Sequence, residues 1–268
     1  MMFGIKKNHQ GDRKLRLIDS DAPFAFVEAY KSLRTNIDFI CSSNNYHSIL
    51  VTSAGSWDGK STVAINLSKA LADNGKRVVL VDCDMRKASL SSYLKIARNT
   101  DGITSVLAGS KKLPEVIVWE EAMGLYVLPV GRVPSNPAEV VGSERMIQLL
   151  RALEERFEYV IIDTPPVSVV TDAAILSRFV DGVVLVARAD ETTKQALNLS
   201  KKNLEDVNAH ILGVVLNDYN AKKHAYGKGY YYSSYYRYSK YGYYGYGKEK
   251  KKRSRKKKSS ARQDQAET

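Results

Sequence analysis

The chain has 268 residues and a formal net charge of +12, and this charge is unevenly distributed. Residues 222–268 hold 15 of the 41 basic and 3 of the 29 acidic residues, so residues 1–221 carry 26 of each sign and are neutral. A neutral body with a basic appendage excludes a basic nucleic-acid-binding domain, and the length gives room for one sizeable α/β domain.

The composition also indicates the compartment. The two cysteines, Cys41 and Cys83, show no metal-type spacing, which favours a reducing cytosol with both thiols buried. No run approaches the roughly 18 apolar residues of a membrane span, and the N-terminus turns polar too soon for a signal peptide. We expect a cytoplasmic protein that depends on another molecule for any work at a membrane.

The first 22 residues are polar, and we predict a flexible N-terminus. A helix is predicted over residues 23–41, because apolar residues recur there every three or four positions, at Phe26, Tyr30, Leu33, Ile37 and Ile40. Strands are then predicted over residues 47–54, 77–84, 124–131, 159–163, 182–188 and 211–217. Further helices are predicted over residues 61–75, 143–156, 171–180 and 192–207.

The predicted strands are continuous apolar runs, and they do not alternate with polar residues. Both faces of their sheet must therefore be covered. We predict an α/β fold, a P-loop NTPase-like parallel sheet with helices on both faces. Ligands of such sheets bind at the carboxyl ends of the strands.

The apolar pattern ends after Asn217. Residues 226–246 contain eleven tyrosines among glycine, serine and lysine, and a run of basic residues follows over 248–258. Almost no Leu, Ile or Val is present, so no core can form and we predict disorder. The predicted domains are a flexible N-terminus (1–22), a P-loop domain (23–221) and a disordered tyrosine-rich and basic tail (222–268).

The segment SAGSWDGKST, residues 53–62, joins a predicted strand to a predicted helix. It contains the Gly59-Lys60-Ser61 core of a phosphate-binding loop, although Ala54 stands where the usual pattern has glycine. A phosphate here would meet backbone N–H groups and the helix N-terminus. Lys60 would reach the β- and γ-phosphates, and Ser61 would offer its hydroxyl to Mg²⁺.

Two acidic motifs end predicted strands. In VDCDMR, Asp82 and Asp84 lie one residue apart on an extended chain and point the same way, so beside a nucleotide they can serve Mg²⁺ and accept a proton. In YVIID, Asp163 follows four apolar residues, as in a Walker B motif, whose carboxylate holds Mg²⁺. Together with the phosphate loop, these motifs predict a magnesium–nucleotide P-loop ATPase.

The order of these motifs, followed by a tyrosine cluster, resembles the bacterial tyrosine kinases that govern capsule and exopolysaccharide synthesis, in their stand-alone cytoplasmic form. In that family VDCDMR is the Walker A′ motif. The resemblance also includes EAYKSLRTNI, PSNPAEVVGSERM, TDAAILSRFVDGVVLVAR and GVVLN. Related partitioning and septum-placing ATPases carry a signature lysine where this chain has Gly55.

The resemblance implies a protein tyrosine kinase that phosphorylates itself with ATP and regulates polymer synthesis and export. It implies catalytic roles for Lys60, Asp82, Asp84 and Asp163, and a Mg²⁺ site at Ser61, Asp82 and Asp163. The nucleotide contacts it implies are Gly55, Ser56, Trp57, Asp58, Gly59, Lys60, Ser61, Thr62 and Asn217. The expected phosphoacceptors are Tyr226, Tyr230, Tyr231, Tyr232, Tyr235, Tyr236, Tyr238, Tyr241, Tyr243, Tyr244 and Tyr246.

Trp57 is the main departure from the family pattern, which usually has Pro-Gly where this chain has Ser56-Trp57. Glycine suits a position with positive φ close to phosphate, and tryptophan in that conformation costs about 1–2 kcal/mol. The phosphate donors are backbone groups, so the loop can still bind. We expect the indole outside the phosphate nest, against either the nucleotide or a neighbouring subunit. A weak or inactive kinase remains an alternative.

The N-terminal segment EAYKSLR aligns with a family motif that builds a ring of subunits. Glu28, Lys31 and Arg34 lie three residues apart on one helical face, and the resemblance implies an oligomer interface there. Lys31 replaces an arginine of the motif and loses its bidentate fork. An ordinary solvated face with a charged pair is the alternative.

The tail is a suitable substrate, because a flexible segment has a high effective concentration near an active site and can enter a neighbour's site in a ring. The alternative function is a nucleotide-switched ATPase whose tail binds nucleic acid or membrane. Eleven tyrosines beside a neutral body favour the kinase. Contact with anionic lipid and simple solvation both remain open for the basic run.

The resemblance also implies partners. In this family the kinase domain is either fused to a transmembrane activator or made separately, and this chain resembles the separate type. We expect a transmembrane chain-length regulator that recruits the protein to the inner face of the cell membrane. A homo-oligomeric ring and a cognate tyrosine phosphatase are expected as well, and no specific nucleic acid.

Overall fold

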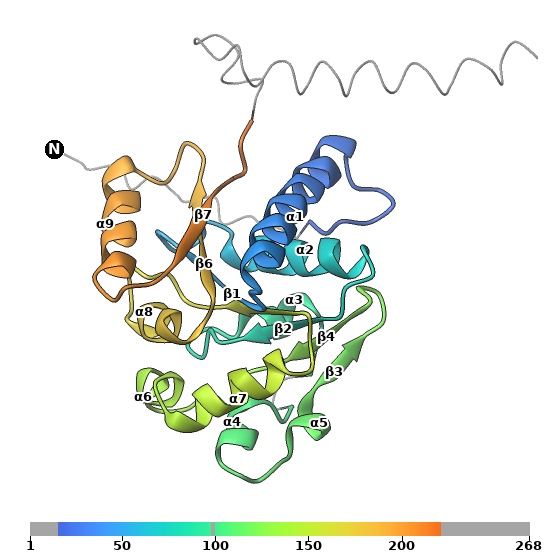
Figure 1. Cartoon of the computed structure of the whole chain (residues 1–268), viewed down its shortest axis with the longest axis vertical. Helices are drawn as coiled ribbons and strands as arrows, with labels where there is room; N and C mark the ends of the chain where they lie inside the picture. Colours follow the sequence, from blue (N-terminus) through green and yellow to red (C-terminus); the bar gives the residue numbers. More distant parts are fainter. Residues whose placement is uncertain (1–15, 98–99, 221–268) are drawn as a thin grey trace, which may run out of the picture. The chain divides into compact units, whose positions relative to one another are not determined.

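The computed structural model describes residues 16–97 and 100–220. Strands in these ranges form one seven-stranded sheet with the order β3-β4-β2-β5-β1-β6-β7 (Figure 1). Every neighbouring pair is parallel except β3 and β4. The predicted parallel sheet is therefore confirmed, with one antiparallel strand at its edge. The strands are β1 (Ser48–Ser53), β2 (Val78–Asp82), β3 (Val118–Glu120), β4 (Leu125–Leu128), β5 (Tyr159–Asp163), β6 (Gly182–Arg188) and β7 (Ile211–Asn217).

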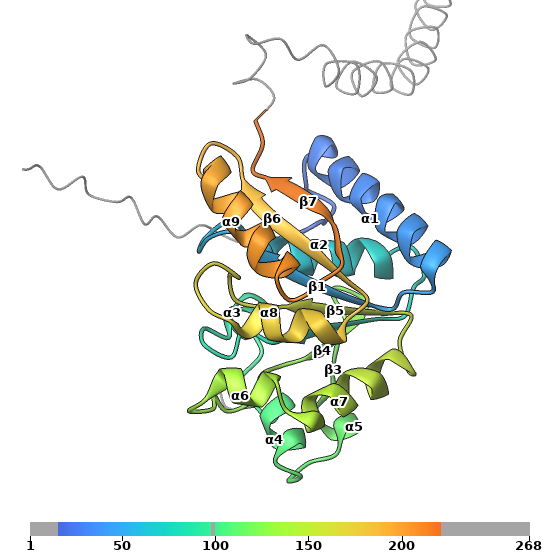
Figure 2. The same cartoon turned by 60° about the vertical axis from the view of Figure 1, so that its left-hand side comes forward.

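Helices cover both faces of the sheet, as predicted (Figure 2). One face carries α1 (Phe24–Asn44), α2 (Lys60–Ala72) and α3 (Ser89–Tyr93), and Ile49 and Val51 of β1 point into its core. Leu50 points into the opposite core. The helices there are α4 (Ile103–Leu107), α5 (Leu113–Val116), α6 (Pro137–Val141), α7 (Glu144–Glu154), α8 (Asp172–Leu176) with the 3₁₀ turn η1 (Ser177–Phe179), and α9 (Lys194–Glu205).

Strand β3 and the short helices α3 to α6 were not predicted. Strand β3 has only three residues, and its central Trp119 is exposed. Its indole packs edge-on against Tyr126 of β4, with 4.8 Å between ring centroids. A strand this short and open shows no apolar run, so its pairing depends on a contact that only the folded chain makes.

Part of the predicted flexible N-terminus, residues 1–22, is packed against the folded domain. Ile18 is buried in a small cluster with Tyr30 and Ala70, and its N–H donates to Asn66 Oδ1 at 2.8 Å. A single apolar residue in a polar stretch has no periodicity, which is why this contact was not predicted. Residues 1–15 lie outside the described ranges.

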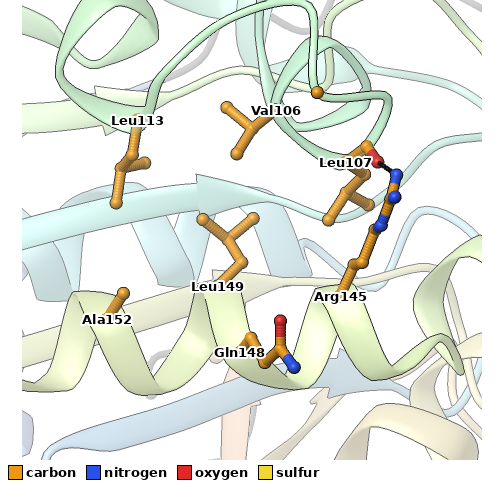
Figure 3. A pocket seen from close by; sticks show the side chains of 8 residues that line it. Val106, Leu107, Leu113, Arg145, Gln148, Leu149 and Ala152 are labelled. Carbon is orange, nitrogen blue, oxygen red and sulfur yellow. Dashed lines mark hydrogen bonds between the residues drawn. The ribbon is translucent and has the colours of Figure 1, made fainter.

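An open groove of about 340 Å³ lies between α4, α5 and α7 (Figure 3). Leu149 of α7 lies at its centre, and the Arg145 guanidinium donates to the Leu107 carbonyl at 2.6 Å. No residue of the phosphate loop, the Walker A′ motif or the Walker B motif lines this groove. Within the described ranges, no helix is both long and apolar enough to cross a membrane.

Candidate active site at the carboxyl edge of the sheet

The phosphate loop connects β1 to α2 at the carboxyl edge of the sheet, where ligands of parallel sheets bind. Gly59 precedes the helix with a φ of 93°, and a Cβ atom there would lie 1.9 Å from Asn217 Nδ2. Both the backbone conformation and the close approach of Asn217 therefore require glycine. Lys60 and Ser61 form the first turn of α2, and their backbone N–H groups belong to the helix N-terminus.

A buried carboxylate shapes the loop from within. Asp58 Oδ2 accepts the Gly55 N–H at 2.6 Å, and Oδ1 accepts the Thr192 hydroxyl at 2.9 Å. The side-chain amide of Asn217 donates to the Asp58 carbonyl at 2.8 Å, so the end of β7 is tied to the loop. Thr192, which the sequence analysis did not single out, therefore helps to fix the loop. A threonine between two regular elements carries no signal of such a contact.

Two buried carboxylates lie side by side at the ends of neighbouring strands. Asp82 ends β2 and Asp163 ends β5, and the two residues are register partners. Both are fully buried, and Asp82 Oδ2 has no hydrogen-bond partner. Asp84 follows two residues later and is also buried, with its N–H donating to Asp82 Oδ1 at 3.2 Å. The fold thus brings together the three acids that the sequence analysis placed in one site.

The phosphate-loop residues contact these acids directly. Lys60 Nζ lies 2.8 Å from Asp84 Oδ2 and 3.5 Å from Asp163 Oδ1. The Ser61 hydroxyl donates to Asp163 Oδ2 at 2.6 Å. One lysine and one hydroxyl therefore join the Walker A, Walker A′ and Walker B motifs in a single cluster.

The electrostatics of this cluster follow from burial and from like charges. Burial raises the pKa of Asp82 well above its ordinary value, and the charges of Asp163 and Asp84 raise it further. Burial also raises the pKa of Asp163, although Lys60 and Ser61 oppose the shift. Burial alone would lower the pKa of Lys60, but Asp163 and Asp84 outweigh it and the pKa is raised, so the ammonium stays charged.

A second ion pair anchors the Walker A′ segment. Arg86 Nε donates to Asp172 Oδ2 at 2.9 Å, and its NH2 group donates to Oδ1 at 2.8 Å. Asp172 is fully buried at the start of α8. This bidentate contact holds the segment that carries Asp84 against helix α8. Asp172 was not predicted, because an acid in the first turn of a helix is an ordinary feature.

Trp57 adopts the left-handed conformation that the family glycine suggested, with a φ of 73°. Its side chain leaves the phosphate loop, and the residue is 62% exposed. The ammonium of Lys87, which follows the Walker A′ motif, lies 3.7 Å from the indole centroid. Contact of the indole with the nucleotide or with a neighbouring subunit stays a prediction.

The remaining predicted residues lie as follows. Ser56 is exposed at the loop, and Thr62 is half-buried in the first turn of α2. On α1, Lys31 Nζ pairs with Glu28 at 2.8 Å, whereas Arg34 NH1 turns inward and donates to the Ala70 carbonyl at 3.4 Å. The predicted phosphoacceptor tyrosines lie outside the described residues.

A phosphate loop at the carboxyl edge of a parallel sheet, facing acids on two neighbouring strands, defines a P-loop nucleotide-binding domain. In agreement, a family model described as an AAA domain matches residues 49–212. Nucleotide binding by this domain follows from the family.

More specific similarity is to tyrosine kinases. The chain is 35% identical over 230 residues to tyrosine-protein kinase YwqD of Bacillus subtilis (strain 168), covering 85% of this chain and 96% of the relative. It is 33% identical over 229 residues to tyrosine-protein kinase wzc of Salmonella typhi, covering 85% of this chain but 31% of that much longer protein. The solved kinase domain of Escherichia coli tyrosine kinase ETK matches with a TM-score of 0.68 and 32% identity, covering 76% of this chain and 80% of that one.

The chain therefore belongs to the bacterial tyrosine kinases of the capsule and exopolysaccharide type. It is a protein-tyrosine kinase, and the resemblance stated from its motifs is confirmed. The comparisons favour this function over the nucleotide-switched ATPase considered as the alternative.

Proposed function

We propose that the chain transfers the γ-phosphate of ATP to tyrosines of its own tail and that the acidic cluster around Lys60 performs this transfer. The observation that carries the proposal is the position of the Lys60 ammonium, 2.8 Å from Asp84 and 3.5 Å from Asp163, at the mouth of the phosphate loop. A lysine ammonium at that point can exchange its carboxylate partners for phosphate oxygens and neutralise the charge that develops there.

The residues present also fit a magnesium ion. Asp82 Oδ2 is a buried oxygen without a partner, and Asp163 and the Ser61 hydroxyl lie in the same cluster. No group of three or more acids, histidines or cysteines in the described part of the chain is arranged to hold a metal by itself. Mg²⁺ needs only one or two carboxylates beside nucleotide phosphates, so Ser61, Asp82 and Asp163 would hold it. When bound, Mg²⁺ neutralises charge on the phosphates.

Asp84 is the residue that we assign as the base. It lies beyond the fully buried Asp82 on the same segment, and its Oδ2 atom holds Lys60. When Lys60 moves to the phosphates, that oxygen becomes free to accept the proton of a tyrosine hydroxyl. The phenolate oxygen then bonds to the γ-phosphorus as the bond to the β–γ bridging oxygen breaks, and ADP leaves.

Strand β7 ends beside this site. The described chain ends at residue 220, soon after Asn217 contacts the phosphate loop and Asp218 pairs with Arg188 at 2.6 Å. Eleven tyrosines follow within residues 226–246. We propose that these tyrosines, Tyr226 to Tyr246, enter the site of a neighbouring copy in a ring that uses Glu28, Lys31 and Arg34.

The cellular setting is proposed from the relatives. The chain spans 96% of the length of YwqD and 31% of the length of wzc. We propose that a transmembrane chain-length regulator activates the kinase at the inner face of the cell membrane. A tyrosine phosphatase would reverse the modification. The basic run 248–258 would contact anionic lipid. The predicted P-loop domain (23–221) and the predicted tail (222–268) would then act as kinase and substrate.

A mixing experiment tests transfer between copies. Full-length Lys60→Met supplies an unaltered tail but no activity, and full-length protein with its eleven tail tyrosines changed to Phe supplies activity but no acceptor. Incubated together with Mg-ATP, the pair should place phosphate on the Lys60→Met tail, and neither protein should do so alone. Failure of the mixture, when the wild type modifies its own tail, would rule out transfer between copies.

A further inference from the structure

Trp57 is a strained and exposed residue at the edge of the active site. Its φ of 73° places a bulky side chain in a conformation that favours glycine, and 62% of the residue is exposed. Neither burial of the indole nor a backbone turn explains this residue, since glycine would form the same turn without strain. A strained side chain that lies on an active-site loop is a reason to look for a function.

The indole of Trp57 lies on the Walker A′ side of the active site. The Trp57 carbonyl accepts the NH1 group of Arg188 at 3.3 Å, near the end of β7, where Asn217 also contacts the loop. The indole instead lies over the Walker A′ segment, against Lys87. The Lys87 N–H donates to Asp84 Oδ1 at 3.1 Å, so the indole lies next to the segment that carries the assigned base. In the proposed function the acceptor hydroxyl must reach Asp84, so the indole lies on a side of the site that an acceptor would pass.

The chemistry of the exposed ring restricts its ligand. Indole faces bind cations and pack against other aromatic rings. The Lys87 ammonium already lies on the ring at 3.7 Å, and a second cation beside it would be repelled. An uncharged aromatic ring is therefore the favoured ligand. The tail offers such rings beside most acceptors, because its tyrosines are clustered as Tyr230–Tyr232, Tyr235–Tyr236 and Tyr243–Tyr244.

We propose that Trp57, held by Lys87, is an acceptor subsite that binds the aromatic ring next to the tyrosine being phosphorylated. This subsite gives the kinase a preference for adjacent tyrosines, which a glycine at residue 57 would not provide. The inference rests on the proposed function, in which tail tyrosines are the acceptors.

Two peptides isolate the preference. Both cover residues 239–248 with Tyr241 and Tyr246 changed to Ala, so that Tyr244 is the single acceptor. In one peptide Tyr243 is changed to Phe, and in the other to Ala. The enzymes are full-length chains whose eleven tail tyrosines are changed to Ser, with Trp57, Trp57→Phe or Trp57→Gly. Each tail then neither accepts phosphate nor occupies the subsite.

The measured quantity is the ratio of kcat/KM for the two peptides at saturating Mg-ATP, because any effect of residue 57 on ATP binding or turnover cancels in it. With Trp57 the Phe peptide should be preferred about three- to tenfold, as expected for one aromatic contact. Trp57→Phe should retain part of this preference, and Trp57→Gly should reduce it to about one.

Different results would overturn the Trp57 subsite and the assignment of the tail as acceptor. An equal preference in the Trp57 and Trp57→Gly enzymes would overturn the subsite and leave the tail as the acceptor. If the wild type places no phosphate on its own tail and no enzyme modifies either peptide, then the proposed acceptor is wrong and the subsite is rejected with it.

Discussion

Lys60 and Asp84 form an ion pair across the phosphate site, with 2.8 Å between Nζ and Oδ2. The lysine comes from the first turn of α2 and the acid from the segment after β2, so one contact joins two motifs that lie apart in the sequence. Without nucleotide, the ammonium neutralises carboxylates that burial makes costly. Nucleotide phosphates must compete for this lysine, and binding frees the carboxylate that we assign as the base.

The buried acid pair should make stability fall as the pH rises. The pKa of Asp82 is raised in the folded state, so between the ordinary aspartate pKa and that raised value the folded protein binds more protons than the unfolded chain. The stability that protonated Asp82 contributes is therefore present at acidic pH and is lost as the pH rises through the raised pKa.

Asp82→Asn removes this dependence. The variant should be more stable than the wild type by roughly 1–3 kcal/mol at pH 8, and the difference should shrink towards pH 4. Urea unfolding of both ligand-free proteins across this range measures it. Parallel stability curves for the two proteins would contradict a raised pKa of the buried Asp82.

Much of this architecture could be predicted from sequence because it depends on continuous features. The apolar runs ending in Asp82 and Asp163 predicted both the buried strands and the shared edge of the acids. Asp172 and Thr192 could not be found in this way, because their roles depend on partners distant in the chain. The sequence indicated that residue 57 needs positive φ, but only the folded chain places its indole on Lys87.

The Arg86–Asp172 pair should support both stability and turnover. Arg86→Ala leaves the buried Asp172 carboxylate without its bidentate partner and should cost roughly 1–3 kcal/mol of unfolding free energy. It should also lower kcat, because the segment with Asp84 loses its anchor. Arg86→Lys is the matched control, since it keeps the charge but loses the bidentate fork. Its unfolding free energy and kcat should lie between those of the wild type and Arg86→Ala. A fully stable and active Arg86→Ala variant would show that the pair does not position the segment.

Exchange of two charges on α1 tests the proposed ring. The double variant Glu28→Lys with Lys31→Glu keeps the opposite-charge pair of the helix, now in reversed order, but inverts the pattern offered to a neighbour. It should remain folded yet run as a smaller species than the wild type in size-exclusion chromatography with light scattering. If its mass equals that of the wild-type assembly, these two residues do not form the interface.

Phosphorylation of the tail should loosen the assembly. Each phosphate adds about −1.5 to −2 charge at pH 7, which offsets the basic tail and repels Asp82, Asp84 and Asp163. The wild type should therefore shift to smaller species in Mg-ATP. The variant with all eleven tail tyrosines changed to Phe keeps the aromatic bulk and should stay assembled. Equal masses for both proteins before and after ATP would mean that the tail does not control assembly.

The most direct test of the account is mass spectrometry of the tail after incubation with Mg-ATP. Wild-type protein should carry phosphate on tyrosines within residues 226–246. Lys60→Met should lose at least about 100-fold of this activity while remaining folded by circular dichroism, because Lys60 serves the transferred phosphate and not the core. A wild-type tail without phosphate, or a folded Lys60→Met protein that is modified like the wild type, would contradict the assignment of this site as the kinase centre.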